Sequence, residues 1–127
     1  MGTSFVEYKK FGFWTRDRFL ESWLISLVKE MQELPHLEAW QKALIEHWHL
    51  QASIGGGCMS LDLDQFLIDR AREESVLTVA QQALGHTPAL GHRTGELFID
   101  LLAGRLKTTE SSPIDYLNDP QEARARQ

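Results

Sequence analysis

The side chains best placed for chemistry in this sequence are His47 and Gln51, which lie four residues apart within a helical pattern. Residues spaced this way share one side of a helix, and both fall inside or at the edge of an apolar face. Burying two hydrogen-bonding side chains costs on the order of 1 to 3 kcal/mol unless each finds a partner. The pair is therefore either a structural pair bonded to the N-terminal arm or to the glycines at 55–57, or part of a ligand pocket.

In the ligand interpretation, the pocket lies between two predicted helices and has two tryptophans as its floor. Cys58 belongs with it, because this residue follows three glycines and precedes a predicted helix start, where a thiolate is favoured. No third orienting residue accompanies the cysteine, and a lone Cys is more often a small buried side chain. We therefore predict no catalytic residue. The candidate ligand-binding residues are His47, Gln51, Cys58, Trp23 and Trp48.

Metal and phosphate chemistry find little support in the spacing of the residues. No His-x-x-x-His pair exists, and Glu46 with His49 forms a Glu-x-x-His pair on a helix face predicted to look toward solvent. The glycines at 55–57 are not followed by a Lys-Ser or Lys-Thr pair, so a phosphate loop is not indicated. The aspartates at 62, 64 and 69 sit near helix starts, where capping explains them. We predict no metal site and no cofactor.

The strongest element that could position these residues is a helix over residues 19–34, whose apolar side chains fill about half of a helical wheel. Thr15 is predicted to be its N-cap, with Asp17 in the first turn and Trp14 forming a hydrophobic staple. Ile25 alone breaks the pattern, on the polar side. A single exposed Ile is usually an ordinary surface residue. Ile25 is nevertheless our candidate for contact with a partner or another subunit.

A second helix is predicted to carry His47 and Gln51. Pro35 ends the first helix, and the next runs from about 36 to 54, stopping at Gly55. The two should form an antiparallel hairpin.

Three further helices follow from capping signals. Asp62 is predicted to start a short helix to about residue 68, and Asp69 a longer one over 70–84. The glycines and proline in 85–93 predict a loop. Thr94 then caps a last helix to about residue 106.

The two ends of the chain are peripheral in this interpretation. Residues 1–14 form an aromatic arm, left without a secondary structure, whose rings lie on the core. The tail over 107–127 is polar, with short helical turns predicted at Ser112-Pro113 and Asp119-Pro120. No strand pattern competes with the helices. We therefore predict an all-α fold, a single-domain bundle of four to five helices over 1–127.

Length, charge and cysteine content narrow the class of protein. The 127 residues suit one domain, and 13 Lys plus Arg against 18 Asp plus Glu give a net charge of -5. The basic residues do not cluster, which argues against nucleic acid as a partner. A single cysteine and the lack of a signal-peptide pattern favour a reducing cytoplasm. No apolar run approaches the ~18 residues of a membrane span, so no membrane association is predicted.

The segment from Glu46-His47-Trp48 through Gln51-Ala52 and Gly57-Cys58-Met59-Ser60 to the run at 63–67 resembles a group of small uncharacterised bacterial cytoplasmic proteins. This resemblance covers about a quarter of the chain and brings no known active site. In size, acidity and tryptophan content the chain is also similar to immunity proteins, which neutralise toxins delivered by competing bacteria.

Two hypotheses about function follow. The first is a non-enzymatic protein-interaction module, which binds a protein partner, a basic one being suited, or associates with itself. A toxin-neutralising protein is its most concrete form. The second is a small-ligand- or metal-binding helical protein that uses a pocket near His47, Gln51 and Cys58.

Overall fold

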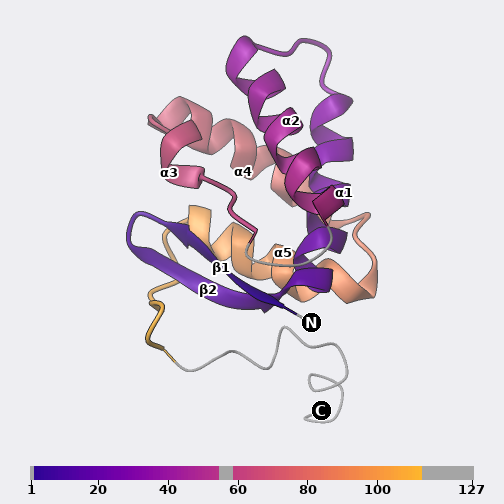
Figure 1. The fold of residues 1–127 in the computed structure, drawn as a ribbon. Coiled ribbons are helices and arrows are strands. Elements are labelled where there is room, and N and C mark those ends of the chain that lie inside the picture. Colours follow the sequence, from indigo (N-terminus) through magenta and orange to yellow (C-terminus); the bar gives the residue numbers. More distant parts are fainter. Residues whose placement is uncertain (1, 55–58, 113–127) are drawn as a thin grey trace.

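The chain folds into a two-stranded sheet and a larger set of helices (Figure 1). The computed structural model describes residues 2–54 and 59–112. In these residues the order of elements is β1 (Thr3–Tyr8), β2 (Phe11–Arg16), α1 (Asp17–Gln32), α2 (Ala39–Ile54), α3 (Leu63–Phe66), α4 (Arg70–Leu84) and α5 (Ala89–Leu102). Helices dominate, but the fold is mixed α/β. The prediction of an all-α bundle was wrong.

The N-terminal arm is an antiparallel β-hairpin, because its side chains alternate with the period of two that a strand requires. In β1, Val6 and Tyr8 are buried, whereas Glu7 between them is exposed. Lys9 and Lys10 form the two-residue turn, with φ of 49° and 67°. Positive φ at both central residues is the type I′ geometry that matches the twist of a hairpin.

Helix α1 is at the centre of the fold, since it packs against α2, α4 and α5 (Figure 1). One continuous hydrophobic cluster takes residues from the hairpin and from each of the described helices. The hairpin lies on α5 and contributes Val6, Tyr8 and Phe13 to this cluster. The expectation that the aromatic side chains of the arm reach the core is met by Tyr8 and Phe13.

The N-cap of α1 lies one residue after the predicted one, Thr15. Arg16 occupies the N-cap position and makes no side-chain cap hydrogen bond, while Asp17 lies in the first turn as predicted. Thr15 belongs to β2, and its buried hydroxyl shares a hydrogen bond of 2.9 Å with the Thr94 hydroxyl. Thr15 does not cap α1 because its hydroxyl bonds to Thr94 on α5 instead of to a backbone N–H at the start of α1.

Helices α1 and α2 form the predicted antiparallel hairpin, joined by residues 33–38. Helix α2 begins at Ala39, three residues later than predicted. The backbone N–H of Glu38 donates to Gln41 Oε1 at 2.7 Å, which is the reach-back bond of a capping box. This bond fixes the helix start.

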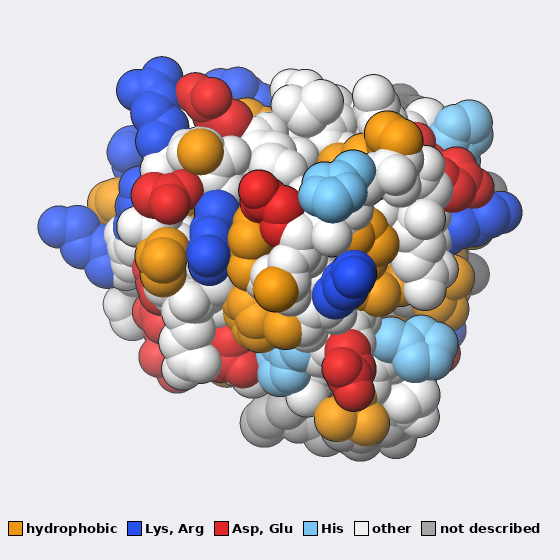
Figure 2. Space-filling view, turned by 90° about the horizontal axis from the view of Figure 1, so that it is seen from above, with side chains coloured by type: hydrophobic (Ala, Val, Ile, Leu, Met, Phe, Trp, Pro, Cys, Tyr) orange, Lys and Arg blue, Asp and Glu red, His pale blue; other side chains and the backbone are white. Residues whose placement is uncertain are grey.

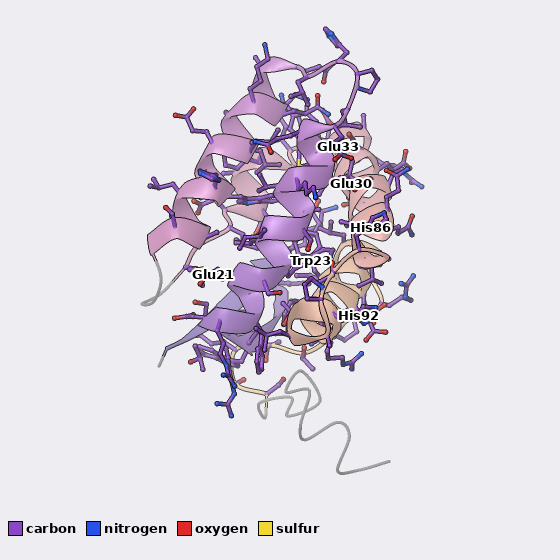
Figure 3. The ribbon with its side chains drawn as sticks, turned by 90° about the vertical axis from the view of Figure 1, so that its right-hand side faces the viewer. Glu21, Trp23, Glu30, Glu33, His86 and His92 are labelled. Atoms are coloured by element: carbon purple, nitrogen blue, oxygen red, sulfur yellow. The ribbon has the colours of Figure 1, made fainter. Side chains whose placement is uncertain are left out.

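Helix α5 begins at Ala89, so the predicted loop over 85–93 was wrong in its second half, and Thr94 lies within the helix. The glycines that suggested a loop are packing residues. A Cβ on Gly91 would lie 2.7 Å from the backbone N of Trp23, and one on Gly95 would lie 2.6 Å from the Trp23 ring. Trp23 points from α1 toward α5 (Figure 3). Only glycine permits this close approach of the two helices.

Of the other predicted N-caps, Asp69 is confirmed and Asp62 makes no cap hydrogen bond. Asp69 caps α4 as predicted, accepting a hydrogen bond from the Arg72 N–H, and α4 ends before Gly85. Asp62 occupies the N-cap position of α3 but makes no cap bond, because its carboxylate is turned toward α2. The turns predicted from Pro113 onward lie outside the described residues. No helix in the described part of the chain is long and apolar enough to cross a membrane.

Candidate functional site

The structure brings the two candidate residues of α2 together on one segment. His47 Nε2 lies 2.9 Å from the backbone oxygen of Ser60 and 2.8 Å from Asp62 Oδ2. The N–H of Ser60 donates to Gln51 Oε1 at 2.9 Å. His47 and Gln51 therefore hold residues 60–62 against α2. These bonds reach neither the N-terminal arm nor residues 55–57, which were the partners predicted for a structural pair.

The side chains of this cluster hold residues 60–62 in place against α2, and we call it the 60–62 clamp. The Ser60 hydroxyl donates to Asp62 Oδ1 at 2.9 Å, and the imidazole of His47 bonds to the other carboxylate oxygen. An activated serine would direct its hydroxyl to the imidazole, with the carboxylate behind the ring. Here both groups bond to the carboxylate instead. Phe66 packs beside the imidazole, with ring centroids 5.7 Å apart.

The two candidate tryptophans are wholly buried. The indole N–H of Trp48 donates to the Leu61 oxygen at 3.0 Å, and both rings pack around Phe98. Their rings fill the core between α1, α2 and α5. Cys58 lies outside the described residues. A ligand site that uses Cys58 with His47 and Gln51 stays a prediction.

The remaining histidines are dispersed over the surface. His86 in the α4–α5 connection and His92 on α5 lie on the side of the molecule shown in Figure 3, as do Glu30 and Glu33 at the end of α1. Within residues 2–54 and 59–112, no group of three or more His, Cys, Asp or Glu is placed to hold a metal ion.

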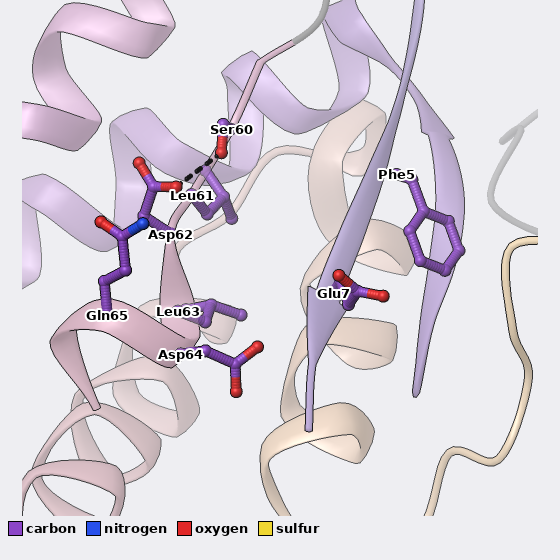
Figure 4. Close-up of a pocket in the computed structure, with 8 residues that line it drawn as sticks. All are labelled: Phe5, Glu7, Ser60, Leu61, Asp62, Leu63, Asp64 and Gln65. Atoms are coloured by element: carbon purple, nitrogen blue, oxygen red, sulfur yellow. Dashed lines mark hydrogen bonds between the residues drawn. The ribbon is translucent and has the colours of Figure 1, made fainter. Parts of the chain in front are cut away.

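A groove of about 260 Å³ runs between β1 and the segment that leads into α3 (Figure 4). We call it the β1 groove. Its lining residues are Phe5, Glu7, Ser60, Leu61, Asp62, Leu63, Asp64 and Gln65. Asp64 points toward β1, where its Oδ1 accepts a hydrogen bond from the Lys9 N–H at 3.0 Å. Three of the eight lining residues are acidic and none is basic, so the groove is negatively charged.

One wall of the groove is a strand edge with unused backbone groups. In a hairpin closed by a two-residue turn, Tyr8 and Phe11 form a hydrogen-bonded pair, and such pairs alternate with non-bonded ones. The backbone groups of Thr3, Phe5 and Glu7 therefore point away from β2. For Phe5 and Glu7, no bond from these outward groups to any other described residue exists.

The opposite edge of the sheet is covered. The Gly12 N–H donates to the Thr108 oxygen at 2.9 Å, and the Thr108 hydroxyl donates back to the Gly12 oxygen. The indole of Trp14 donates to the Glu110 oxygen at 2.9 Å. Residues after α5 thus line β2, and the open edge of the sheet belongs to β1.

A second ionisable cluster lies at the turn end of the hairpin, beside a cavity of about 230 Å³. Buried Tyr8 donates its hydroxyl to Glu73 Oε2 at 2.7 Å, and Lys9 Nζ lies 3.1 Å from the same oxygen. Burial, together with the hydrogen bond and charge of Glu73, raises the pKa of Tyr8 well above its ordinary value. Partial burial alone would raise the pKa of Glu73, but the bonds from Tyr8 and Lys9 outweigh it and lower that pKa.

Ile25 is exposed, as the helical wheel predicted, with 56% of its surface accessible. Leu50, Ile68 and Leu90 are further exposed apolar residues that the sequence did not single out. These four lie on different elements, α1, α2, the α3–α4 connection and α5. No interface follows from their exposure.

The β1 groove was missed because the strand itself was missed. The available signal was the alternation of outward Thr3, Phe5 and Glu7 with inward Val6 and Tyr8. Six residues of alternation are enough for a strand, but the turn beside them carries no glycine or asparagine.

Comparison of the chain with protein-family models, with curated proteins and with solved structures finds no match.

Proposed function

We propose that this protein is a non-enzymatic interaction module that binds a basic protein partner through the β1 groove. The observation that carries the proposal is the acidic groove beside an open strand edge. Glu7 and Asp64 contribute its charge, while the carboxylate of Asp62, which also lines the groove, bonds to His47 and Ser60. Lys9 bonds to Asp64 through its backbone N–H, but its ammonium group is engaged with Glu73 outside the groove lining.

The negative charge of the chain and of the groove favours a basic partner. A net charge of -5 attracts cationic partners and raises their association rate at low salt. The face seen in Figure 2 intersperses side chains of both charges with apolar ones, whereas the groove carries a single sign.

The most concrete form of the proposal is a toxin-neutralising protein. Its support is the similarity to immunity proteins in size, acidity and tryptophan content, together with the negative groove. The expected partner is then a basic toxin domain, whose cationic surface the groove would neutralise.

The experiment compares capture of a partner by charge variants of the full chain. Glu7→Gln with Asp64→Asn removes two charges from the groove, while Glu33→Gln with Glu46→Gln removes two from exposed sites on α1–α2. Both variants have the same net charge. We expect a stoichiometric basic protein from the source cell to bind the chain and the control pair, and to bind the groove pair at least tenfold more weakly.

Binding should also weaken between 50 and 300 mM salt, measured by calorimetry with the captured protein. Equal binding by the two double variants would remove the groove from the proposal. Turnover of a metabolite by the isolated chain would contradict a non-enzymatic role.

A further inference from the structure

We infer that the partner contributes a short extended segment, which pairs with β1 as a third strand of the sheet. This inference rests on the proposed function and specifies how the β1 groove is used. Its basis is the strand edge that forms one wall of the groove, with outward backbone groups at Phe5 and Glu7.

The outward groups are spaced as a strand ladder requires. Alternate residues of a strand lie about 6.6 to 6.8 Å apart, and the neighbouring strand lies about 4.8 Å away in the plane of the sheet. Phe5 and Glu7 each offer one N–H and one carbonyl in that plane. An extended segment in the groove would satisfy them, whereas a helix would present no free backbone groups.

The walls predict the side chains of the added strand. On the outer face, beside exposed Glu7, a Lys or Arg would meet a carboxylate across the strands. On the inner face, the groove is lined by buried Leu61 and Leu63, so a small or apolar side chain of the added strand fits against them. The expected segment alternates basic and apolar residues.

Two contacts limit the length of this segment. At the turn end, Asp64 bonds to the Lys9 N–H. At the other end, the Met59 N–H donates to the Ser4 hydroxyl at 2.9 Å, and that hydroxyl in turn donates to Asp17. Pairing is therefore confined to the stretch between Ser4 and Lys9, where Phe5 and Glu7 carry the outward groups. A second copy of this chain is a poor occupant, because it would bring another Glu7 and another net charge of -5 to the same edge.

The test uses a synthetic seven-residue peptide of alternating Lys and Val, blocked at both ends, with the ¹⁵N-labelled full chain. The amides of Phe5 and Glu7 should exchange rapidly with solvent in the free chain. At saturating peptide we expect their exchange to slow at least tenfold, while that of Val6, already bonded within the hairpin, changes little.

Two N-methylated versions of the peptide sharpen the test. One is methylated on the Lys amides and the other on the Val amides, which point to opposite edges of an extended strand. Strand addition predicts that one version binds at least tenfold more weakly than the other. Equal binding would overturn it.

Two variants of β1 test strand addition independently of the methylated peptides. Glu7→Gln removes the charge, and Glu7→Pro removes in addition the outward N–H, which the hairpin does not use. We expect the proline variant to bind the peptide at least fivefold more weakly than the glutamine variant. If Glu7→Pro does not fold, as circular dichroism would show, exchange and the methylated peptides decide on the unmodified chain.

The outcomes separate this inference from the proposed function. Salt-dependent binding that Glu7→Gln weakens, with unchanged exchange at Phe5 and Glu7, would overturn strand addition and leave the acidic groove in place. The amides could also be protected without peptide, to a degree that rises with protein concentration, in a sample whose mass is that of a dimer. That result would assign the edge to a second copy and overturn the inference. No protection by either the peptide or the captured partner would also overturn it.

Discussion

The hydroxyl groups of Thr15 and Thr94 share a hydrogen bond of 2.9 Å inside the core, and this bond joins β2 to α5. Both side chains are almost wholly buried. Removing one hydroxyl leaves the other without its partner, which costs about 1 to 3 kcal/mol. We therefore expect Thr94→Val to lower the free energy of unfolding by that amount in urea denaturation.

The double variant Thr15→Val with Thr94→Val checks the cause of that loss. Replacing both partners by apolar groups of the same shape is close to neutral, so the double variant should be more stable than either single one. Additive losses would show that the threonines act through packing and not through their shared bond.

Gly95 is a site where added volume should be damaging. A Cβ there would lie 2.6 Å from the Trp23 ring and 2.9 Å from Leu84 Cδ1. Because both neighbours are held in the core, Gly95→Ala should cost about 1 to 3 kcal/mol of stability. Gly85→Ala is the matched control, since its Cβ would meet only the Gln82 oxygen, at 3.5 Å. The control should be neutral or slightly stabilising, and equal losses in both variants would contradict this account.

Acid should destabilise the protein through Glu73. Its pKa is lowered in the folded state by the hydrogen bonds from Tyr8 and Lys9, which outweigh partial burial. A carboxyl with a lowered folded pKa stabilises the fold above its unfolded pKa, near 4.5, and loses that contribution as the pH falls through the folded value. Urea denaturation between pH 7 and 3 should show this loss. Glu73→Gln should reduce the slope, and an unchanged slope would rule Glu73 out as its source.

Alkali should destabilise the protein through Tyr8. Burial, followed by the hydrogen bond and charge of Glu73, raises the pKa of this phenol in the folded state. The unfolded chain releases the proton near pH 10, so the contribution is present below that pH and is lost above it. Denaturation at pH 8 to 11.5 should show a decline. In Tyr8→Phe that decline should be smaller, and an equal decline in both would remove Tyr8 as the cause.

The clamp on residues 60–62 should be local. Gln51 accepts the Ser60 N–H, so Gln51→Ala should expose that amide to solvent and speed its hydrogen exchange at least tenfold. Because the bond is exposed, global stability should change by less than about 1 kcal/mol. Exchange at the Leu67 N–H, bonded within α3, serves as the internal reference. Equal acceleration at both amides would indicate general unfolding instead.

Sequence reasoning recovered the elements whose signals are local. The apolar stripe over 19–34 and the Asp69 cap predicted α1 and α4, because helical period and capping act within a few residues. The hairpin was missed because Lys9 and Lys10 adopt positive φ without the usual glycine or asparagine. The start of α5 was misplaced because Gly91 serves close packing on α1, and that purpose appears only once both helices are present.

For the candidate site, too, the local features could be predicted from the sequence and the long-range ones could not. That His47 and Gln51 share one side of α2 follows from their spacing, and the structure places both on Ser60. Their partner could not be identified from the sequence, because it depends on how the chain returns to α2. The β1 groove could not be identified at all, since it joins Glu7 to Asp64 across 57 residues of sequence.

The long reach of the hairpin has a consequence for folding during synthesis. Gly12 in β2 bonds to Thr108, 96 residues later, and Thr15 bonds to Thr94, 79 residues later. The first sixteen residues leave the ribosome before either partner exists, and contacts this distant in sequence form slowly. The buried face of the hairpin therefore stays uncovered until α5 emerges. The hairpin is synthesised before α5 but completes its packing after it.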